Sequence, residues 1–194
     1  MLASWSELLW ANRADGTAVD TTASEASLLT GLNQQPVLPA FFFDGPQKIG
    51  KTISIKAGGV FSNTGTPTLI FQARLGTTAG ASYLSGGSVG VTAAITTANG
   101  VTNKWWELDL DLTLRTPGIG TGNSTLSGAG KVSSPSGFAS PFVYPIEITT
   151  PDTATWTQTF DAGLTQYFNL SVTWSASSAS NTITLKKLLA WAWN

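Results

Sequence analysis

The sequence predicts an all-β fold, an antiparallel β-sandwich with an arm at its N-terminus. One long stretch alternates strictly between apolar and polar residues, and shorter alternating stretches follow one another with turn residues between them. With 194 residues, the chain is long enough to bury one sizeable core. We therefore expect an arm at residues 1–30 and a single sandwich domain at residues 31–194.

The arm is expected to be extended or to form a short helix. Ser4 and Glu7 have the spacing of a helical capping box, and Leu2, Trp5 and Leu9 recur at helical spacing. Two interpretations of its apolar residues stay open: they pack on the domain itself, or they dock onto a neighbouring subunit or scaffold. The residues that would dock are Trp5, Leu8, Leu9 and Trp10.

The clearest strand lies at residues 104–116. Its apolar side chains share one parity and its charged side chains the other, which is typical of a strand with one buried face. A helix would instead place Glu107 and Asp111 one turn apart, where like charges repel. The apolar residues are Trp106, Leu108, Leu110, Leu112 and Leu114. This face needs a second layer to cover it, and the other predicted strands make that layer a second sheet.

Shorter stretches supply the remaining strands, roughly eight or nine in all. Residues 36–39 are held extended by two prolines, and residues 49–57 alternate. The glycine pair 58–59 then predicts a bulge or bend. The later predicted strands are 66–75, 83–94, 124–132, 146–148, 156–160, 167–174 and 183–193. The last of them changes phase at the lysine pair 186–187.

Composition excludes several kinds of site. Cysteine and histidine are absent, so thiolate nucleophiles, disulfides, zinc–thiolate sites and imidazole-based triads are excluded. A formal net charge of -1 with 11% charged residues makes nucleic acid and anionic membranes poor partners. No apolar run approaches the ~20 residues of a membrane span, and residues 1–7 lack the pattern of a signal peptide. We expect a protein that is not an enzyme and that holds no cofactor.

One motif has the letters of a nucleotide site without its setting. Residues 45–52, GPQKIGKT, match the phosphate-loop pattern GxxxxGK[ST]. That loop works because a helix follows it and presents N–H groups to the phosphates. Here strand-like alternation and two glycines follow. The motif therefore predicts the entry to a strand, and we do not expect nucleotide binding.

The polar face of the long strand carries three carboxylates, Glu107, Asp109 and Asp111. Alternate residues of a strand lie ~7 Å apart, a spacing that suits a calcium ion or the acid and nucleophile of a glycosidase. The glycosidase pair would be Asp109 and Asp111. We favour a plain solvated strand face, whose charge is balanced at its ends by Lys104 and Arg115.

Four aromatic residues are candidates for a surface role. Trp105 is expected to point outward with the carboxylates, where it would stack on a sugar or anchor a subunit interface. Tyr83 is a second candidate for such a platform. Trp191 and Trp193 share one face of the last predicted strand, which we interpret as core or interface.

Six segments together carry a family resemblance. They are 28–31 (LLTG), 38–42 (LPAFF), 50–59 (GKTISIKAGG), 66–76 (TPTLIFQARLG), 172–175 (VTWS) and 180–185 (SNTITL). In this pattern, the chain resembles small jelly-roll virion proteins of tailed bacteriophages over residues 26–194. The resemblance implies a sandwich of the jelly-roll type and is one of pattern, without catalytic residues.

The resemblance also implies a function. Such proteins include head decoration (cement) proteins, often trimeric, and tail-associated proteins. The first hypothesis is a non-enzymatic homotrimer, made in the host cytoplasm, that binds the major capsid protein on the outer surface of the virion head. Its arm would insert between capsid subunits. The alternative is a tail-associated carbohydrate- or receptor-binding module that uses Trp105 or Tyr83.

Overall fold

The chain folds almost entirely into antiparallel strands. The computed structural model describes residues 6–32, 35–80, 84, 86–120, 122–148 and 157–193. These residues contain no α-helix, and one 3₁₀ turn covers Pro46–Lys48. The strands are β1 (Ser6–Ala11), β2 (Ala26–Ser27), β3 (Val37–Leu38), β4 (Thr52–Ser62), β5 (Thr68–Gly76), β6 (Gly87–Val91), β7 (Ile95–Thr96), β8 (Lys104–Thr116), β9 (Ser124–Ser133), β10 (Val143–Glu147), β11 (Gln158–Phe160), β12 (Gln166–Trp174) and β13 (Thr182–Trp193).

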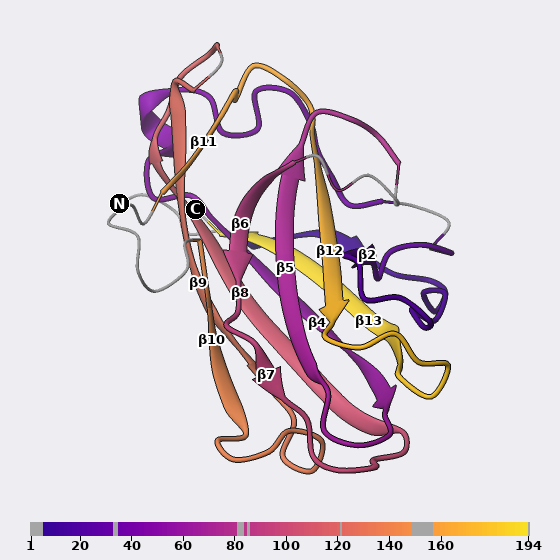
Figure 1. Cartoon of the computed structure of the whole chain (residues 1–194). Coiled ribbons are helices and arrows are strands. Elements are labelled where there is room, and N and C mark those ends of the chain that lie inside the picture. Colours follow the sequence, from indigo (N-terminus) through magenta and orange to yellow (C-terminus); the bar gives the residue numbers. More distant parts are fainter. Residues whose placement is uncertain are drawn as a thin grey trace.

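The strands form two layers that face each other (Figure 1). The hydrogen-bonded order runs β1-β13-β4-β8-β9-β10 in one layer and β6-β5-β12-β2 in the other. A single residue pair, Glu147 with Val91, joins β10 to β6. The short strands β3, β7 and β11 extend the layers beside β12, β5 and β9. This arrangement confirms the predicted antiparallel β-sandwich, but the strand order does not confirm the jelly-roll type.

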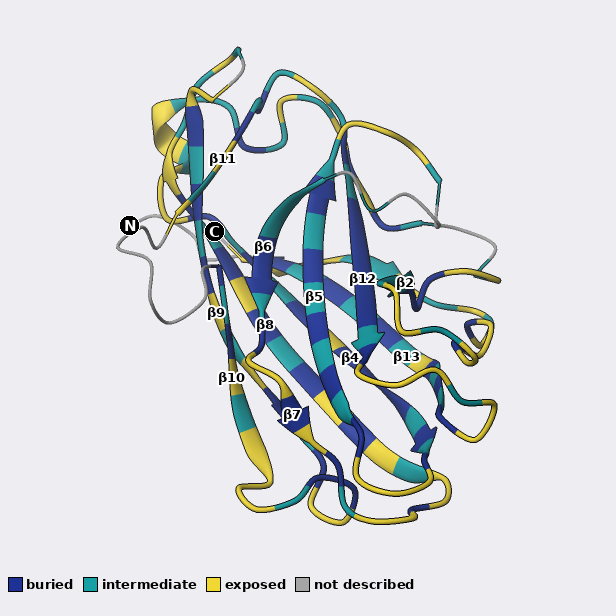
Figure 2. Ribbon diagram, in the orientation of Figure 1, coloured by how far each residue is buried: buried dark blue, intermediate teal, exposed yellow. Residues whose placement is uncertain are grey.

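Strand β8 covers the residues predicted for the long strand. Its even-numbered apolar side chains, from Trp106 to Leu114, are buried, and the alternation is visible along the ribbon in Figure 2. The Trp106 ring meets Phe71 of β5 across the core, with centroids 5.0 Å apart. Contacts of this kind between the inner faces hold the two layers together, because burying each large apolar side chain is worth about 1.5–3 kcal/mol.

The glycine pair of β4 does not interrupt the strand. The irregularity expected there lies in the partner strand, where the register of β13 shifts between Leu185 and Lys187. A Cβ atom on Gly59 would stand 1.9 Å from the carbonyl oxygen of Thr184. The glycine is therefore needed for close approach of the bulged backbone of β13. The predicted phase change at residues 186–187 is confirmed.

The helix expected in the arm is wrong for residues 6–11, which form the edge strand β1 against β13. An isolated helix of two or three turns is marginal in water, whereas the free edge of β13 offers backbone partners for the same residues. The contact continues beyond β1. The Asn12 side chain accepts a hydrogen bond from Leu188 N at 2.7 Å, and Val19 bridges to Ile183.

Candidate functional site

The polar side chains of β13, β4 and β8 form one solvent-facing surface, which we call the outer face. The strand register places Ser54 of β4 beside Asp111 of β8 and Lys56 of β4 beside Asp109. Glu107 follows on the same side of β8. The three carboxylates thus point away from the buried leucines, as the alternation of residues 104–116 predicts.

The carboxylates of the outer face are paired with neighbours on β4. Lys56 Nζ lies 3.5 Å from Asp109 Oδ1, and both side chains are about half exposed. The Ser54 hydroxyl donates to Asp111 Oδ1 at 2.5 Å. Exposed pairs of this kind are worth little to stability, about 0–1 kcal/mol, but they fix where the side chains point.

The calcium and glycosidase hypotheses gain no support from this arrangement. Within the part of the chain that the structure describes, no three acidic side chains gather closely enough to hold a metal ion. Asp109 is paired with a lysine and Asp111 with a serine, and both project from the same strand, so the two carboxylates do not face each other across a bond to be cleaved. The pairing of these carboxylates on an exposed strand is compatible with the solvated strand face that we favour, which stays a prediction.

Trp105 lies on the outer face, as predicted, with 42% of its surface exposed. Its indole N–H donates to Glu107 Oε1 at 3.2 Å. The ring covers the backbone of Gly58, where an added Cβ would come within 3.0 Å of Trp105 Cζ2. Trp105 is therefore held flat along the sheet with one side open to solvent. Tyr83, the other residue proposed as a glycan platform, lies outside the described residues.

Trp191 and Trp193 also belong to the outer face and not to the core. The inward positions of β13 at this end are taken by Ala190 and Ala192, which are buried. Trp191 is partly buried and Trp193 is 49% exposed. The two indoles line a shallow depression together with Ser54, Lys56, Asp109 and Asp111. Of the two interpretations that the alternation of β13 allowed, the core is wrong for this pair.

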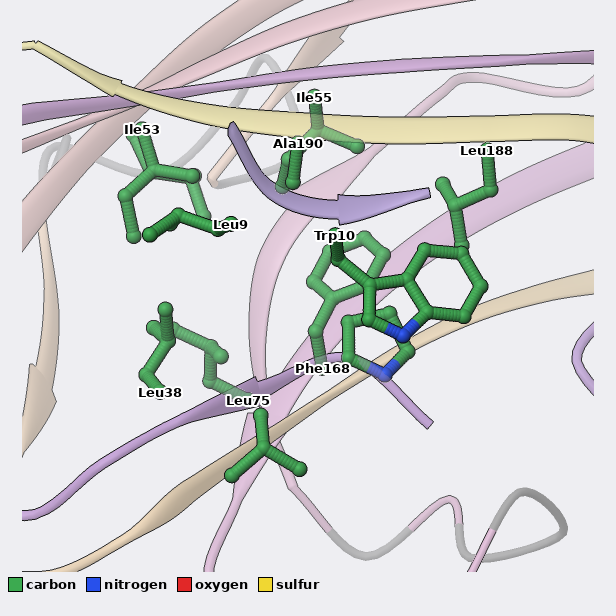
Figure 3. Close-up of a pocket in the computed structure, with 12 residues that line it drawn as sticks. Leu9, Trp10, Leu38, Ile53, Ile55, Leu75, Phe168, Leu188 and Ala190 are labelled. Atoms are coloured by element: carbon green, nitrogen blue, oxygen red, sulfur yellow. The ribbon is translucent and has the colours of Figure 1, made fainter. Parts of the chain in front are cut away.

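The four residues proposed for arm docking have different surroundings. Trp5 lies outside the described residues, and Leu8 is 57% exposed. Leu9 and Trp10 pack against the chain's own core, among side chains of both layers (Figure 3). They border a cavity of about 20 Å³, space for one water molecule rather than for a ligand. Leu9 and Trp10 are buried against this chain's own core and are not open to another subunit. Intermolecular docking by the arm thus remains a prediction for the exposed Leu8 alone among the described residues.

The phosphate-loop motif leads into a strand. Its residues form the 3₁₀ turn and then β4, with no helix to present N–H groups to a phosphate. The motif lysine, Lys51, is buried; its Nζ donates to the carbonyl of Phe42 at 3.3 Å and lies 3.4 Å from the centroid of the Phe42 ring. Burial and, less strongly, the nearby charge of Lys48 lower the pKa of Lys51 from 10.5 to about 8.

Sequence analysis missed the β4 side of the outer face. Ser54 and Lys56 alternate with Ile53 and Ile55, which places them on the polar side of their own strand. Their meeting with Asp109 and Asp111 depends on the register between β4 and β8, strands that are far apart in the chain: Ser62 ends β4, and Asn103, 41 positions later, precedes β8. Local alternation carries no information about that register.

Comparisons with known proteins do not assign this chain to a family. No protein-family model and no curated protein sequence matches it. Among solved structures, it is similar to peanut lectin in complex with a nine-residue peptide, at 11% sequence identity and a TM-score of 0.33, over 98% of this chain and 96% of the lectin chain. A similarity at that level supports no argument about function. The described residues also hold no helix with the length and apolar character of a membrane span.

Proposed function

We propose that this chain is a non-enzymatic structural protein of a bacteriophage virion, which decorates the outer surface of the head and reinforces the shell by binding the major capsid protein. The proposal starts from the sequence resemblance over residues 26–194. The observation that carries it further is the make-up of the outer face, which combines a broad sheet surface with exposed aromatic side chains.

The outer face has the composition of a protein interface. Aromatic residues are enriched where proteins bind one another, because their large rigid side chains gain contact area at small entropic cost. Trp105 and Trp193 are 42% and 49% exposed, and Leu8, which stands opposite Trp191 on the neighbouring strand β1, is 57% exposed. Three carboxylates and the ammonium group of Lys56 stand between these anchors. Such alternating charge would set the register of a partner more than its affinity.

The sandwich is suited to a load-bearing role. Strand pairs between β13, β4, β8 and β9 run over most of the length of these strands, so a force applied across the outer face is shared by many backbone hydrogen bonds. The segment from β1 to Val19 is also bonded to β13. We propose that three such chains associate at each binding position on the shell, as is common for the proteins that this chain resembles.

The location of the protein in assembled particles tests this proposal. Immunogold electron microscopy of particles that carry the chain should label the head shell. The head shells of particles that lack the chain should break open at a lower temperature than those of complete particles. Label confined to the tail would contradict the decoration role. Deletion of the arm is a poor test of docking, because it would also remove Leu9 and Trp10, which cover the protein's own core. The substitution Leu8→Ser tests docking by the arm at an exposed residue and leaves that cover in place.

A second candidate function is a tail-associated carbohydrate- or receptor-binding module. The specific observation in its favour is Trp105, whose ring is held along the sheet by its bond to Glu107 and is open to solvent. Binding of the purified chain to a glycan array, lost in Trp105→Ala, would favour this candidate. An unchanged pattern in that variant would remove Trp105 as the platform.

A further inference from the structure

A depression on the outer face has the size and the side chains of a ligand site. It lies over β13, β4 and β8 and has a volume of about 520 Å³, within the range of small-molecule sites. The side chains that line it are Trp191 and Trp193 from β13, Ser54 and Lys56 from β4, and Asp109 and Asp111 from β8. Trp105, at the far end of β8, is not among them.

The strand register brings these side chains together. Trp191 stands opposite Ser54, and Ser54 stands opposite Asp111, so the three form one row across the sheet. Lys56 and Asp109 form the next row, ~7 Å along the strands. Trp193 belongs to the row on the other side of Trp191. An aromatic wall on β13 therefore faces a polar wall on β8, with β4 as the floor between them.

Hydrogen bonds hold both walls in place without a ligand. Trp193 Nε1 donates to Ser54 Oγ at 2.9 Å, and Ser54 donates to Asp111 Oδ1 at 2.5 Å. Among the described residues, no donor meets the second oxygen of Asp111. Lys56 lies 3.5 Å from Asp109 and keeps donors for another acceptor. A site whose side chains are already ordered binds with a smaller entropic penalty.

One wall is aromatic and the other is polar, and a sugar ring has one surface that suits each of them. A pyranose presents a face of C–H groups and a rim of hydroxyls. The indole faces accept the C–H groups as apolar surface, and the partly exposed rings of Trp191 and Trp193 are amphipathic enough to stand in water when the site is empty. The free oxygen of Asp111 accepts a hydroxyl proton, and Lys56 donates to a hydroxyl or ring oxygen.

The charge of the depression selects among sugars. Asp109 has a cation on both neighbouring strands, Lys56 of β4 and Lys131 of β9. The cross-strand partners of Asp111 are Ser54 and Ala129, so the uncompensated negative charge of the depression lies at Asp111. An acidic sugar would bring a further negative charge next to Asp111, which disfavours it. Lys56 already lies beside Asp109, which makes the same pair of carboxylates a poor site for a cation.

From the depression, its two walls and its charge we infer that the outer face carries a binding site for neutral saccharides, with Trp191 and Trp193 as the stacking surface and Asp111 and Lys56 as the hydrogen-bonding groups. This site is separate from Trp105 and does not depend on the place of the protein in a particle. It would let the sandwich hold a cell-surface or extracellular glycan wherever this part of the outer face is not covered by the capsid.

Indole N–H signals in a ¹H–¹⁵N NMR spectrum of the full chain test the inference directly. The chain has eight tryptophans, and single substitutions assign the signals. The probes are malto-, cello-, manno-, galacto- and chito-oligosaccharides at millimolar concentration, with oligogalacturonate as the acidic counterpart. We expect at least one neutral probe to shift the signals of Trp191 and Trp193 and to leave that of Trp105 unchanged, and oligogalacturonate to have no effect.

Single substitutions measure how much each side chain contributes to the affinity for the saccharide. Trp191→Ala and Trp193→Ala should each weaken binding of that probe about tenfold or more, as expected for the loss of one stacking contact of roughly 1.4 kcal/mol. Trp105→Ala is the control on the same sheet face and should bind like the unmodified chain. Asp111→Asn keeps the shape of the side chain and should narrow the preference for neutral over acidic probes.

Three results would overturn the inference: no shift with any neutral probe, shifts confined to Trp105, or unchanged affinity in the Trp191→Ala, Trp193→Ala double variant. Thermal unfolding of each variant guards against a misfolded sample, and Trp193→Phe, which keeps a ring, provides a milder second test. None of these results bears on labelling of the head shell, so failure of the saccharide site and failure of the decoration role are distinguishable.

Discussion

Arg74 of β5 and Glu25 are joined by two parallel hydrogen bonds, from Nε to Oε1 at 2.9 Å and from Nη2 to Oε2 at 2.8 Å. Both side chains are largely buried, with 19% and 23% of their surfaces exposed. Ser171 of β12 donates to the same carboxylate. Because Glu25 immediately precedes β2, this group ties the N-terminal segment to two strands of the second layer.

Glu25→Gln should lower the free energy of unfolding by about 1–3 kcal/mol, since it leaves a largely buried guanidinium without its charged partner. Urea unfolding measures the change. Asp15→Asn is the control, because it breaks an exposed ion pair with Lys186 and should change stability by no more than about 0.5 kcal/mol. Equal effects of the two substitutions would show that the Glu25–Arg74 pair is not a structural tie.

The Glu25 carboxylate should also make the free energy of unfolding decrease at acidic pH. Burial raises the pKa of Glu25, but the hydrogen bonds from Arg74 and Ser171 and the charge of Arg74 together bring it below 4.5. Its contribution is therefore complete above 4.5, the unfolded value, and is lost as the pH falls through the folded pKa. The stability gap between the unmodified chain and Glu25→Gln should narrow from neutral pH to about pH 3. A gap that stays constant would contradict this linkage.

Lys51 should also make stability rise with pH, but at alkaline pH and for a different reason, because burial in the folded chain disfavours its charged form. Its pKa is about 8 in the folded chain and 10.5 in the unfolded chain. Between these values the unfolded state holds the extra proton, so this group makes stability rise with pH, and above 10.5 the effect is complete. Lys51→Met should remove that rise, whereas Lys104→Met should keep it. The readout is the unfolding free energy of each protein from pH 7 to about pH 11; parallel curves for Lys51→Met and the unmodified chain would refute the assignment.

Trp10 and Leu8 stand on one strand but face different surroundings. Trp10→Ala should cost about 2–4 kcal/mol of stability, because the ring covers the end of the core near Leu188 and Phe168. Leu8→Ala should change stability by less than about 0.5 kcal/mol, since Leu8 is 57% exposed. Thermal unfolding compares the two. If Trp10→Ala were as mild as Leu8→Ala, the arm would not be part of the sandwich in solution.

The glycine pair in β4 should respond unequally to alanine. Gly59→Ala drives a methyl group into the Thr184 carbonyl, where backbone must move, and should cost about 3 kcal/mol or more. A Cβ atom on Gly58 would meet the Trp105 ring at 3.0 Å and the carbonyl oxygen of Trp106 at 3.1 Å, contacts that a shift of a few tenths of an ångström relieves. We therefore expect a clearly smaller loss for Gly58→Ala in chemical unfolding. A larger loss at Gly58 would mean that the bulge in β13 yields more easily than the tryptophan.

Much of the architecture follows from local patterns. The alternation of residues 104–116 predicts both the bounds of β8 and which side of it is buried. The break in alternation at residues 186–187 marks the bulge in β13. These features are readable because side-chain direction along a strand is set by the backbone period of two, which needs no knowledge of the partner strand.

The arm and the depression show where local patterns end. Leu2, Trp5 and Leu9 have helical spacing, yet residues 6–11 pair with β13 because a distant strand offers a free edge there. Trp191 and Trp193 share a face by alternation, but only the pairing of β13 with β4 and of β4 with β8 sets Ser54, Asp111 and Lys56 before them. By itself, the sequence determined the all-β class, the long strand and its buried side. The tertiary structure alone decided which polar residues meet, because register between strands is set by the packing of the whole core and not by any one segment.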